Sequence, residues 1–235
     1  QRNPDTTYNK MSYDELKALN TSIDWDGYFK NAGNITFDSI VVSQPYFYKE
    51  IENIMSSNSM DTWKDYLKWN LISSSANYLT DEISAENFNF YSGTLRGAKE
   101  QKPRWKRAIQ STDRSIGDIL GQEYVKVAFS QEAKDQVYEM VDMLQEAYAE
   151  RIKGLEWMSE ETKKMALHKL STFTRKLGFP DEWKDLTALE IDRESYIKNI
   201  FRVREFWNNR MISKLGKPVD KKEWGMTPST VNAYY

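Results

Sequence analysis

Few residues in this 235-residue chain have side chains that could act as a nucleophile, a base or a metal ligand. The chain has no Cys and a single His, His168. The absence of Cys excludes thiolate catalysis, and a Ser-His-Asp triad would require His168 as its base. In the helix expected here, its neighbours four positions away are Lys164 and Thr172, which cannot orient an imidazole as a carboxylate does. We predict that His168 is a surface or half-buried structural residue and that the chain carries no catalytic residue.

The sequence is equally short of metal ligands. Catalytic zinc sites usually draw on at least two His or Cys side chains. Two acidic clusters, Glu160-Glu161 and Glu190, Asp192 and Glu194, lie where helices are expected to begin, and the helix dipole favours negative charge there. Neither cluster has the spacing of a calcium-binding loop. We predict that no residue of this chain ligates a metal.

The charge balance argues against a nucleic-acid partner. Lys and Arg together number 33 and Asp and Glu number 35, whereas a nucleic-acid surface needs clustered positive charge to neutralise phosphates. Arg104, Lys106 and Arg107 flank Trp105, but on a helix these side chains point in different directions. We expect a solvated face with Trp105 buried. No apolar run approaches the ~20 residues of a membrane-spanning helix, so no membrane segment is predicted.

The elements that would position any site are predicted to be mainly α-helical, with minor β structure. Ser12 and Glu15 have the spacing of a capping box, and Ser59 and Ser159 are expected to cap two further helices. Helices are predicted from Ser12, from Pro45 to about Met55, from Ser59, from Pro103 to a stop at Gly121, from Gln131 to about Leu155, from Ser159 to Gly178, and from Asp192 to Gly216.

Apolar residues at helical spacing on these helices are expected to face a core. The predicted stripes are Trp63, Tyr66, Leu67 and Leu71; Trp105, Ala108, Ile109, Thr112, Ile116 and Leu120; Val137, Met140, Val141, Leu144, Tyr148, Ile152 and Leu155; Ala166, Leu170, Phe173 and Leu177; and Tyr196, Ile200, Val203, Trp207 and Met211. Strand signals are confined to residues 35–42 and 230–235.

Several short motifs in the last third of the chain occur in a distinctive order. Trp157-Met158 is followed by Thr162-Lys163, then by Gly178-Phe179-Pro180-Asp181, and finally by residues 217–235, which end in Val-Asn-Ala-Tyr-Tyr. Their order and spacing resemble those of the neprilysin-like zinc endopeptidases, and the match extends from about Met11 to the end. The bacterial oligopeptidase O-like branch fits best, because animal members carry disulfides and this chain has no Cys.

The resemblance implies a division of the chain. Residues 1–217 would form the helical lobe of the peptidase. Residues 218–235 would form a connection and the first part of a substrate-binding strand, which enters a thermolysin-like catalytic domain in the parent protein. The H-E-x-x-H helix, the third zinc ligand and the other catalytic side chains of the family lie beyond the equivalent of Tyr235. The resemblance therefore implies a zinc cofactor in the intact parent, and we predict that this chain alone binds no zinc and cleaves no peptide.

Asn232 and Ala233 are the two positions of this chain to which the resemblance assigns a functional role. They match the Asn and Ala of the family's substrate-binding strand, which hydrogen-bond the backbone of a peptide and add it as an extended strand. Considered without the motif, Asn232 would be an ordinary turn or strand-edge residue.

The reaction implied for the intact parent is hydrolysis of internal bonds in short peptides. There zinc would polarise the carbonyl group and activate water, with a glutamate as base. The helical lobe would form one wall of the substrate chamber and exclude large folded substrates, and its partner would be the remaining C-terminal catalytic portion. The resemblance also implies a periplasmic or extracellular parent, with or without a membrane anchor. The rival hypothesis is a non-catalytic helical protein-interaction module that binds its partner through an aromatic-rich groove.

Overall fold

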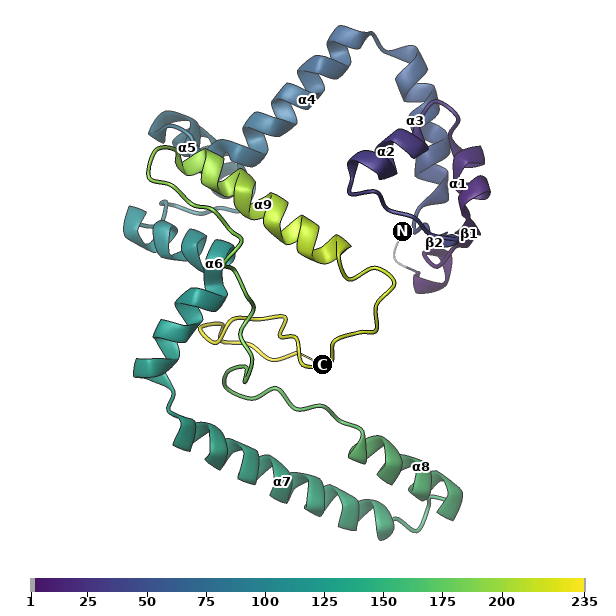
Figure 1. Ribbon diagram of the computed structural model, residues 1–235, viewed down its shortest axis with the longest axis vertical. Helices are drawn as coiled ribbons and strands as arrows, with labels where there is room; N and C mark the ends of the chain where they lie inside the picture. The colour runs from purple at the N-terminus through teal and green to yellow at the C-terminus, as the bar shows by residue number, and fades with distance from the viewer. Residues whose placement is uncertain (1–2, 235) are drawn as a thin grey trace. The chain divides into compact units, whose positions relative to one another are not determined.

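The computed structural model describes residues 3–234 (Figure 1). Within this range the chain has nine α-helices and one small sheet, which confirms the predicted mainly α fold. The helices are α1 (Tyr13–Leu19), α2 (Trp25–Asn31), α3 (Pro45–Ser57), α4 (Met60–Ser75), α5 (Asp81–Phe88), α6 (Arg104–Ala128), α7 (Gln131–Lys153), α8 (Glu160–Ser171) and α9 (Tyr196–Ile212). Short 3-10 segments occupy Pro4–Thr6 and Ala76–Tyr78, and one π-helical segment occupies Asn89–Thr94.

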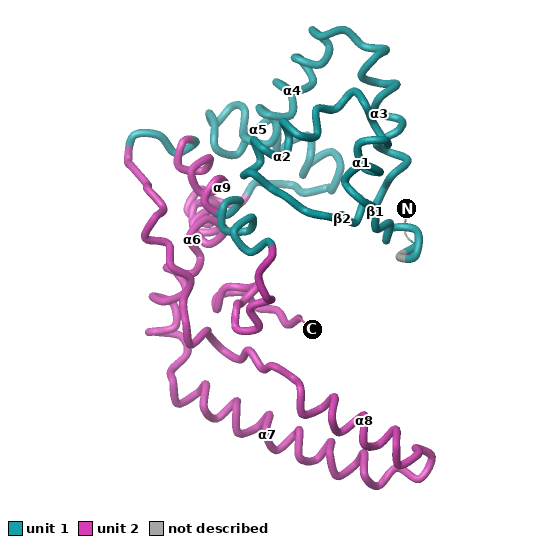
Figure 2. The backbone as a smooth tube through the Cα atoms, turned by 45° about the vertical axis from the view of Figure 1, so that its right-hand side comes forward, with its two compact units in different colours: residues 1–101, 194–197, 207–215 teal, residues 102–193, 198–206, 216–235 magenta. Residues whose placement is uncertain are grey.

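The chain divides into two compact units, which Figure 2 shows in different colours. The first unit comprises residues 1–101, 194–197 and 207–215. The second comprises residues 102–193, 198–206 and 216–235.

The first unit begins with a short antiparallel sheet and a core cluster. Strand β1 (Lys10–Ser12) pairs with β2 (Ser39–Val41), with Met11 opposite Ile40. The second strand confirms part of the strand predicted over 35–42, whereas β1 was not predicted. The buried centre of this core consists of Leu16, Trp25 and Val42. Partly buried apolar side chains pack around it, namely Met11, Tyr13, Leu19, Ile23, Phe29, Phe37, Ile40 and Tyr48.

The predicted capping box at the start of α1 is present. The Glu15 amide donates to Ser12 Oγ at 3.2 Å, and the Ser12 amide donates to the Glu15 carboxylate at 2.7 Å. The hydrogen bonds from the Ser12 amide and hydroxyl lower the pKa of Glu15. The two bonds satisfy amides that the first turn of a helix otherwise leaves unpaired. Ser59 caps α4 in the same manner, since its Oγ accepts from the Thr62 amide at 3.2 Å.

Helix α6 opens the second unit and is longer than predicted. It continues past Gly121 to Ala128, and its backbone departs from helical geometry at Ile116, with φ −134° and ψ 36°. The predicted stop at Gly121 is therefore wrong. Gly121 is buried inside the helix, where a methyl group would lie 2.8 Å from Pro228 Cδ and 3.3 Å from Trp183 Cζ3. Its lack of a side chain makes room for a neighbouring segment and does not terminate the helix.

Helices α7 and α8 run antiparallel to one another in the second unit (Figure 1). Ser130 and Ser159 cap them by accepting from the amides three residues on, as was predicted for Ser159. The predicted end of α8 near Gly178 is wrong, because the helix ends at Ser171. Beyond it Arg175 pairs with Asp142 of α7, which connects the non-helical segment after α8 to α7.

The start of α7 is joined to the segment after α8 by a buried ammonium group. Lys134 Nζ donates to the Phe179 carbonyl at 2.8 Å and to Asp181 Oδ1 at 2.5 Å. It also lies 4.3 Å from the centre of the Phe179 ring. No pattern in the sequence predicted that this long charged residue would lie in the interior.

Helix α9 begins at Tyr196, so the predicted start at Asp192 is wrong. The Asn199 side chain accepts from the Asp192 amide at 3.1 Å and donates to the Asp192 carbonyl at 2.6 Å. The Asp192 carboxylate pairs with Arg202 at 2.5 Å. Asp192 is thus held outside the helix by two side chains from its first turns.

Several residues of the predicted apolar stripes are exposed within the described part of the chain. On α4, Tyr66, Leu67 and Leu71 are exposed, and so are Met140, Leu144 and Tyr148 on α7. Trp105 was expected to be buried, but 61% of its surface is exposed. On α9 the central stripe residues Ile200 and Val203 are buried as predicted. An apolar stripe identifies the face that a helix can bury, but a second element has to cover it.

Candidate substrate-binding segment

The segment that follows α9 returns to helix α6 within the second unit (Figure 1). A methyl group on Gly117 would lie 2.5 Å from Thr227 Cγ2, and one on Gly121 would lie 2.8 Å from Pro228 Cδ. Both distances are far below van der Waals contact, so the two glycines let the chain at 227–228 pack directly against the helix backbone.

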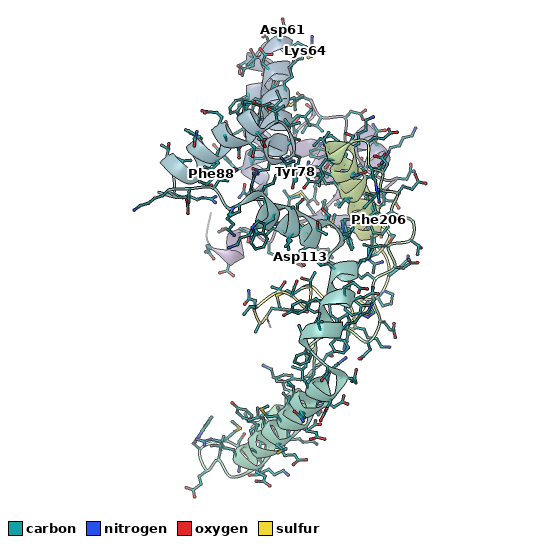
Figure 3. All side chains as sticks on the ribbon, turned by 90° about the vertical axis from the view of Figure 1, so that its left-hand side faces the viewer. Asp61, Lys64, Tyr78, Phe88, Asp113 and Phe206 are labelled. Atoms are coloured by element: carbon teal, nitrogen blue, oxygen red, sulfur yellow. The ribbon has the colours of Figure 1, made fainter. Side chains whose placement is uncertain are left out.

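Asp113, labelled in Figure 3, provides the polar part of the same contact. Its Oδ1 accepts from Thr227 Oγ1 at 3.2 Å and from Ser229 Oγ at 2.9 Å. Thr227 Oγ1 is also 3.0 Å from Thr230 Oγ1, and the Thr230 amide donates to the Thr227 carbonyl at 3.0 Å. Residues 227–230 therefore form a tight turn that a single carboxylate of α6 holds by two hydroxyl groups.

A second set of contacts fixes the chain just before this turn. Lys176 Nζ donates to the Glu223 carbonyl at 2.6 Å, and Lys222 pairs with Glu182 at 3.1 Å. The hydrogen bond from Lys222 to Glu182 and the charge of Glu182 raise the pKa of Lys222. The segment entering the turn is thus attached to the 173–185 region at two points.

Asn232 and Ala233 follow this anchored turn and are exposed. The Asn232 amide donates to the Thr230 carbonyl at 3.1 Å, and the Ala233 amide donates to Asn232 Oδ1 at 2.8 Å. Tyr234 folds back, and its hydroxyl accepts from the Gly225 amide at 3.3 Å. The exposed backbone and carboxamide at 232–233 can form hydrogen bonds with an extended peptide once the Asn232 side chain rotates away from the Ala233 amide.

The strand predicted over 230–235 is not formed in the described part of the segment, residues 230–234. Tyr235 lies outside the described residues. A strand requires hydrogen bonds from a neighbouring strand, and within residues 3–234 the sheet pairs β1 with β2 alone.

The residues considered above as a possible base or metal ligand do not form a site. His168 is exposed on α8, and Glu160 pairs with Lys163 at 2.8 Å. Asp192 is engaged by Arg202 as described above. Among residues 3–234 there is no group of three or more His, Asp or Glu side chains that could hold a metal ion. The residues present therefore do not fit a zinc site. Over the same range, no helix combines the length and apolar character needed to cross a membrane.

The role of Asp113, Gly117 and Gly121 was not predicted from the sequence. Their spacing of four residues is visible there and places small or acidic groups on one side of a helix. Which segment would approach that side could not be inferred, because Thr227 and Asp113 are separated by 114 positions along the chain.

Comparison with known proteins identifies the family. The sequence model of peptidase family M13 matches residues 1–180. The chain belongs to peptidase family M13. An endothelin-converting enzyme homolog of Locusta migratoria is 29% identical over 256 residues, covering 100% of this chain and 35% of the relative. Neprilysin-3 of Drosophila melanogaster is 28% identical, covering 100% of this chain and 32% of the relative.

Solved structures of M13 relatives share the fold along the whole chain. The zinc metalloprotease Zmp1 of Mycobacterium tuberculosis in its open state is 37% identical with a TM-score of 0.90, covering 100% of this chain and 36% of Zmp1. PepO of Lactobacillus rhamnosis has a TM-score of 0.80 at 24% identity and covers 98% of this chain and 37% of PepO, which shows likeness of fold. The chain thus spans about a third of the length of the relatives it matches.

Proposed function

We propose that this chain is the helical part of a zinc metalloendopeptidase that hydrolyses short peptides. Residues 1–217 form its helical lobe and one wall of the substrate chamber, and residues 218–235 lead into the substrate-binding strand. The observation that carries this proposal is the anchored turn at 227–230, which leaves Asn232 and Ala233 exposed in a chain of family M13. The 37% identity to Zmp1, a bacterial zinc metalloprotease, supports the assignment to a bacterial branch and to zinc chemistry.

In this proposal Asn232 and Ala233 bind the backbone of the peptide. The Asn232 carboxamide can both donate and accept, and the Ala233 amide can donate to a substrate carbonyl. Together they extend the peptide as an added strand, in which main-chain hydrogen bonds supply affinity. Zinc and its ligands would belong to the C-terminal catalytic portion of the parent, as the likeness to zinc metalloproteases suggests.

The C-terminal catalytic portion of the parent is the proposed partner of the exposed apolar faces. Leu67 and Leu71 on α4, and Met140 and Leu144 on α7, are uncovered in the described chain. Faces of this kind usually mark an interaction surface. They would equally suit the rival function, a non-catalytic helical interaction module. An assay of peptidase activity distinguishes the peptidase from the interaction module. We further propose a periplasmic or extracellular location, which fractionation of the source cells would test.

The test uses the intact protein and a short fluorogenic peptide. Asn232→Ala removes one hydrogen-bond partner, worth about 0.5–1.5 kcal/mol, and can leave a substrate group unsatisfied at about 1–3 kcal/mol. We expect kcat/KM to fall between a few-fold and about a hundredfold, at about tenfold per 1.4 kcal/mol, with zinc content and Tm retained. Ala233→Pro, which removes the amide donor, should lower kcat/KM more than Ala233→Gly.

His168→Gln is the matched control in the same assay. The side chain is exposed on α8, and Lys164 and Thr172, its neighbours at four positions, are not carboxylates. We expect kcat/KM to stay within about tenfold of the parent value. Full activity in both Asn232→Ala and Ala233→Pro would refute the proposed substrate contact, and absence of any zinc-dependent peptidase activity would favour the interaction module.

A further inference from the structure

We propose that Asp113 and Gly117 of α6 are positioning residues that set the place of the substrate-binding strand. This inference rests on the proposed function of Asn232 and Ala233. Helix α6 carries no group expected to touch substrate. In this inference it determines the position of Asn232 and Ala233.

The contact at Gly117 fixes the segment by steric fit. Gly117 is buried, and a methyl group there would meet Thr227 Cγ2 at 2.5 Å and Asp113 Oδ1 at 3.3 Å. Because Thr227 Oγ1 donates to that same Asp113 oxygen, its methyl group cannot swing away without losing the hydrogen bond. Gly117 does not have a positive φ, so its conformation is open to alanine. Gly117 is therefore needed because it leaves space for the Thr227 methyl group.

The contact at Asp113 fixes the turn by charge-assisted hydrogen bonds. One carboxylate oxygen accepts from Thr227 at 3.2 Å and from Ser229 at 2.9 Å, and such bonds are stronger than neutral ones. The turn ends at Thr230, whose carbonyl accepts the Asn232 amide. Asn232 therefore lies two positions beyond the anchored turn, and a shift of the turn is passed directly to the proposed substrate contacts.

The experiment compares Gly117→Ala with the double variant Gly117→Ala/Thr227→Ser in the intact protein. Serine at 227 keeps the hydroxyl that binds Asp113 and removes the methyl group that the new alanine would strike. Misplacement of a binding group by about 1 Å can cost up to about a hundredfold in rate. We expect Gly117→Ala to lower kcat/KM about tenfold or more on a short peptide, and the double variant to recover to within about threefold of Thr227→Ser alone.

A second pair of variants tests the carboxylate. Asp113→Ala removes the acceptor of both hydroxyls, whereas Asp113→Asn keeps an oxygen that can accept them. In this chain, hydrogen exchange of the amides at 230–233 should become faster in Asp113→Ala and change less in Asp113→Asn, with the amides of α7 unaffected in both. This measurement needs no activity, so it remains informative if Gly117→Ala does not fold.

The outcomes separate this inference from the proposed function. If Asn232→Ala lowers kcat/KM but Gly117→Ala does not, the strand binds substrate and its position does not depend on α6, which overturns the inference. If Thr227→Ser fails to rescue Gly117→Ala, the effect of the alanine does not come from its clash with the Thr227 methyl group, and the inference is again overturned. If Asn232→Ala itself leaves kcat/KM unchanged, the result contradicts the proposed substrate contact on which this inference rests.

Discussion

Replacement of Lys134 by Met tests whether the buried ammonium group stabilises the second unit. The Lys134 side chain is 4% exposed, and its Nζ contacts the Phe179 carbonyl, Asp181 Oδ1 and the Phe179 ring. Methionine is unbranched and similar in length, so it retains most of the apolar packing and removes the charge. The substitution therefore isolates the polar contacts of the ammonium group from the packing of its aliphatic stem.

The expected loss of folding stability depends on which groups lose a hydrogen-bond or ion-pair partner. The Phe179 carbonyl would lose its donor, at about 1–3 kcal/mol if it stays buried, and the contact with the ring is worth about 0.5–2 kcal/mol. The substitution also removes the desolvation penalty of the buried ammonium group, and this gain offsets part of the two losses. Asp181 is 84% exposed, so water solvates its carboxylate after the change. We expect a net loss of about 1–3 kcal/mol.

Lys126→Met is the matched control for this prediction. Lys126 pairs with Glu123 at 2.6 Å, close to the 2.5 Å of the Lys134 pair, but its side chain and that of Glu123 are 66% and 67% exposed. Exposed pairs contribute at most about 1 kcal/mol, so this variant should change stability little.

Urea unfolding and thermal melting of the chain measure both variants. A chain of this length should lose about 2–4 °C in Tm per kcal/mol. The reasoning fails if Lys134→Met is as stable as Lys126→Met or more stable than the parent. That result would mean that the penalty of burying the ammonium group exceeds the value of its contacts.

Two further predictions concern a glycine and a tyrosine. Gly178→Ala should destabilise the chain by about 1–3 kcal/mol more than Gly216→Ala. Both glycines have a positive φ, +74° and +73°, but a methyl group would meet a neighbour only at Gly178, where it would lie 2.5 Å from Phe129 Cε1. Equal losses of stability in urea unfolding would contradict this prediction. The Tyr13 hydroxyl donates to Asp26 at 2.7 Å, which raises its pKa from 10.0 to about 12. The folded-state pKa is the higher one, so the stability from this contact should be present below about pH 10 and lost as pH rises through about 12. Ultraviolet titration of the folded chain should show a component near pH 12 that Tyr13→Phe lacks, and an unchanged titration in that variant would rule the contact out.

Local signals in the sequence located the starts of several helices correctly. Ser12, Ser59 and Ser159 each accept a hydrogen bond from an amide three residues on, as predicted. A cap involves residues a few positions apart, so its geometry is almost fully determined by the local sequence. The ends of helices depended on more distant contacts: Gly121 lies inside α6, and α8 stops seven residues before Gly178.

For the candidate site, the motif Val-Asn-Ala-Tyr-Tyr located Asn232 and Ala233 as residues to test, and their contact with substrate stays a prediction. The sequence did not reveal Asp113 and Gly117, because a carboxylate and a glycine within a helix have many possible uses. Their use here is defined by Thr227 and Ser229, which are more than a hundred positions away. Nor did any local pattern predict Lys134 in the interior.

The sequence by itself determined the helical class, the capped helix starts and the lack of Cys and of all but one His, because these follow from composition and from interactions between near neighbours. Tertiary structure alone decided which glycines make room for another segment, which lysine is buried, and which apolar stripes are covered. Those outcomes depend on the segment that arrives opposite each residue, and periodicity along one helix carries no information about that partner. The anchored turn at 227–230 is such an outcome, since it exists only where α6 and the chain after α9 meet.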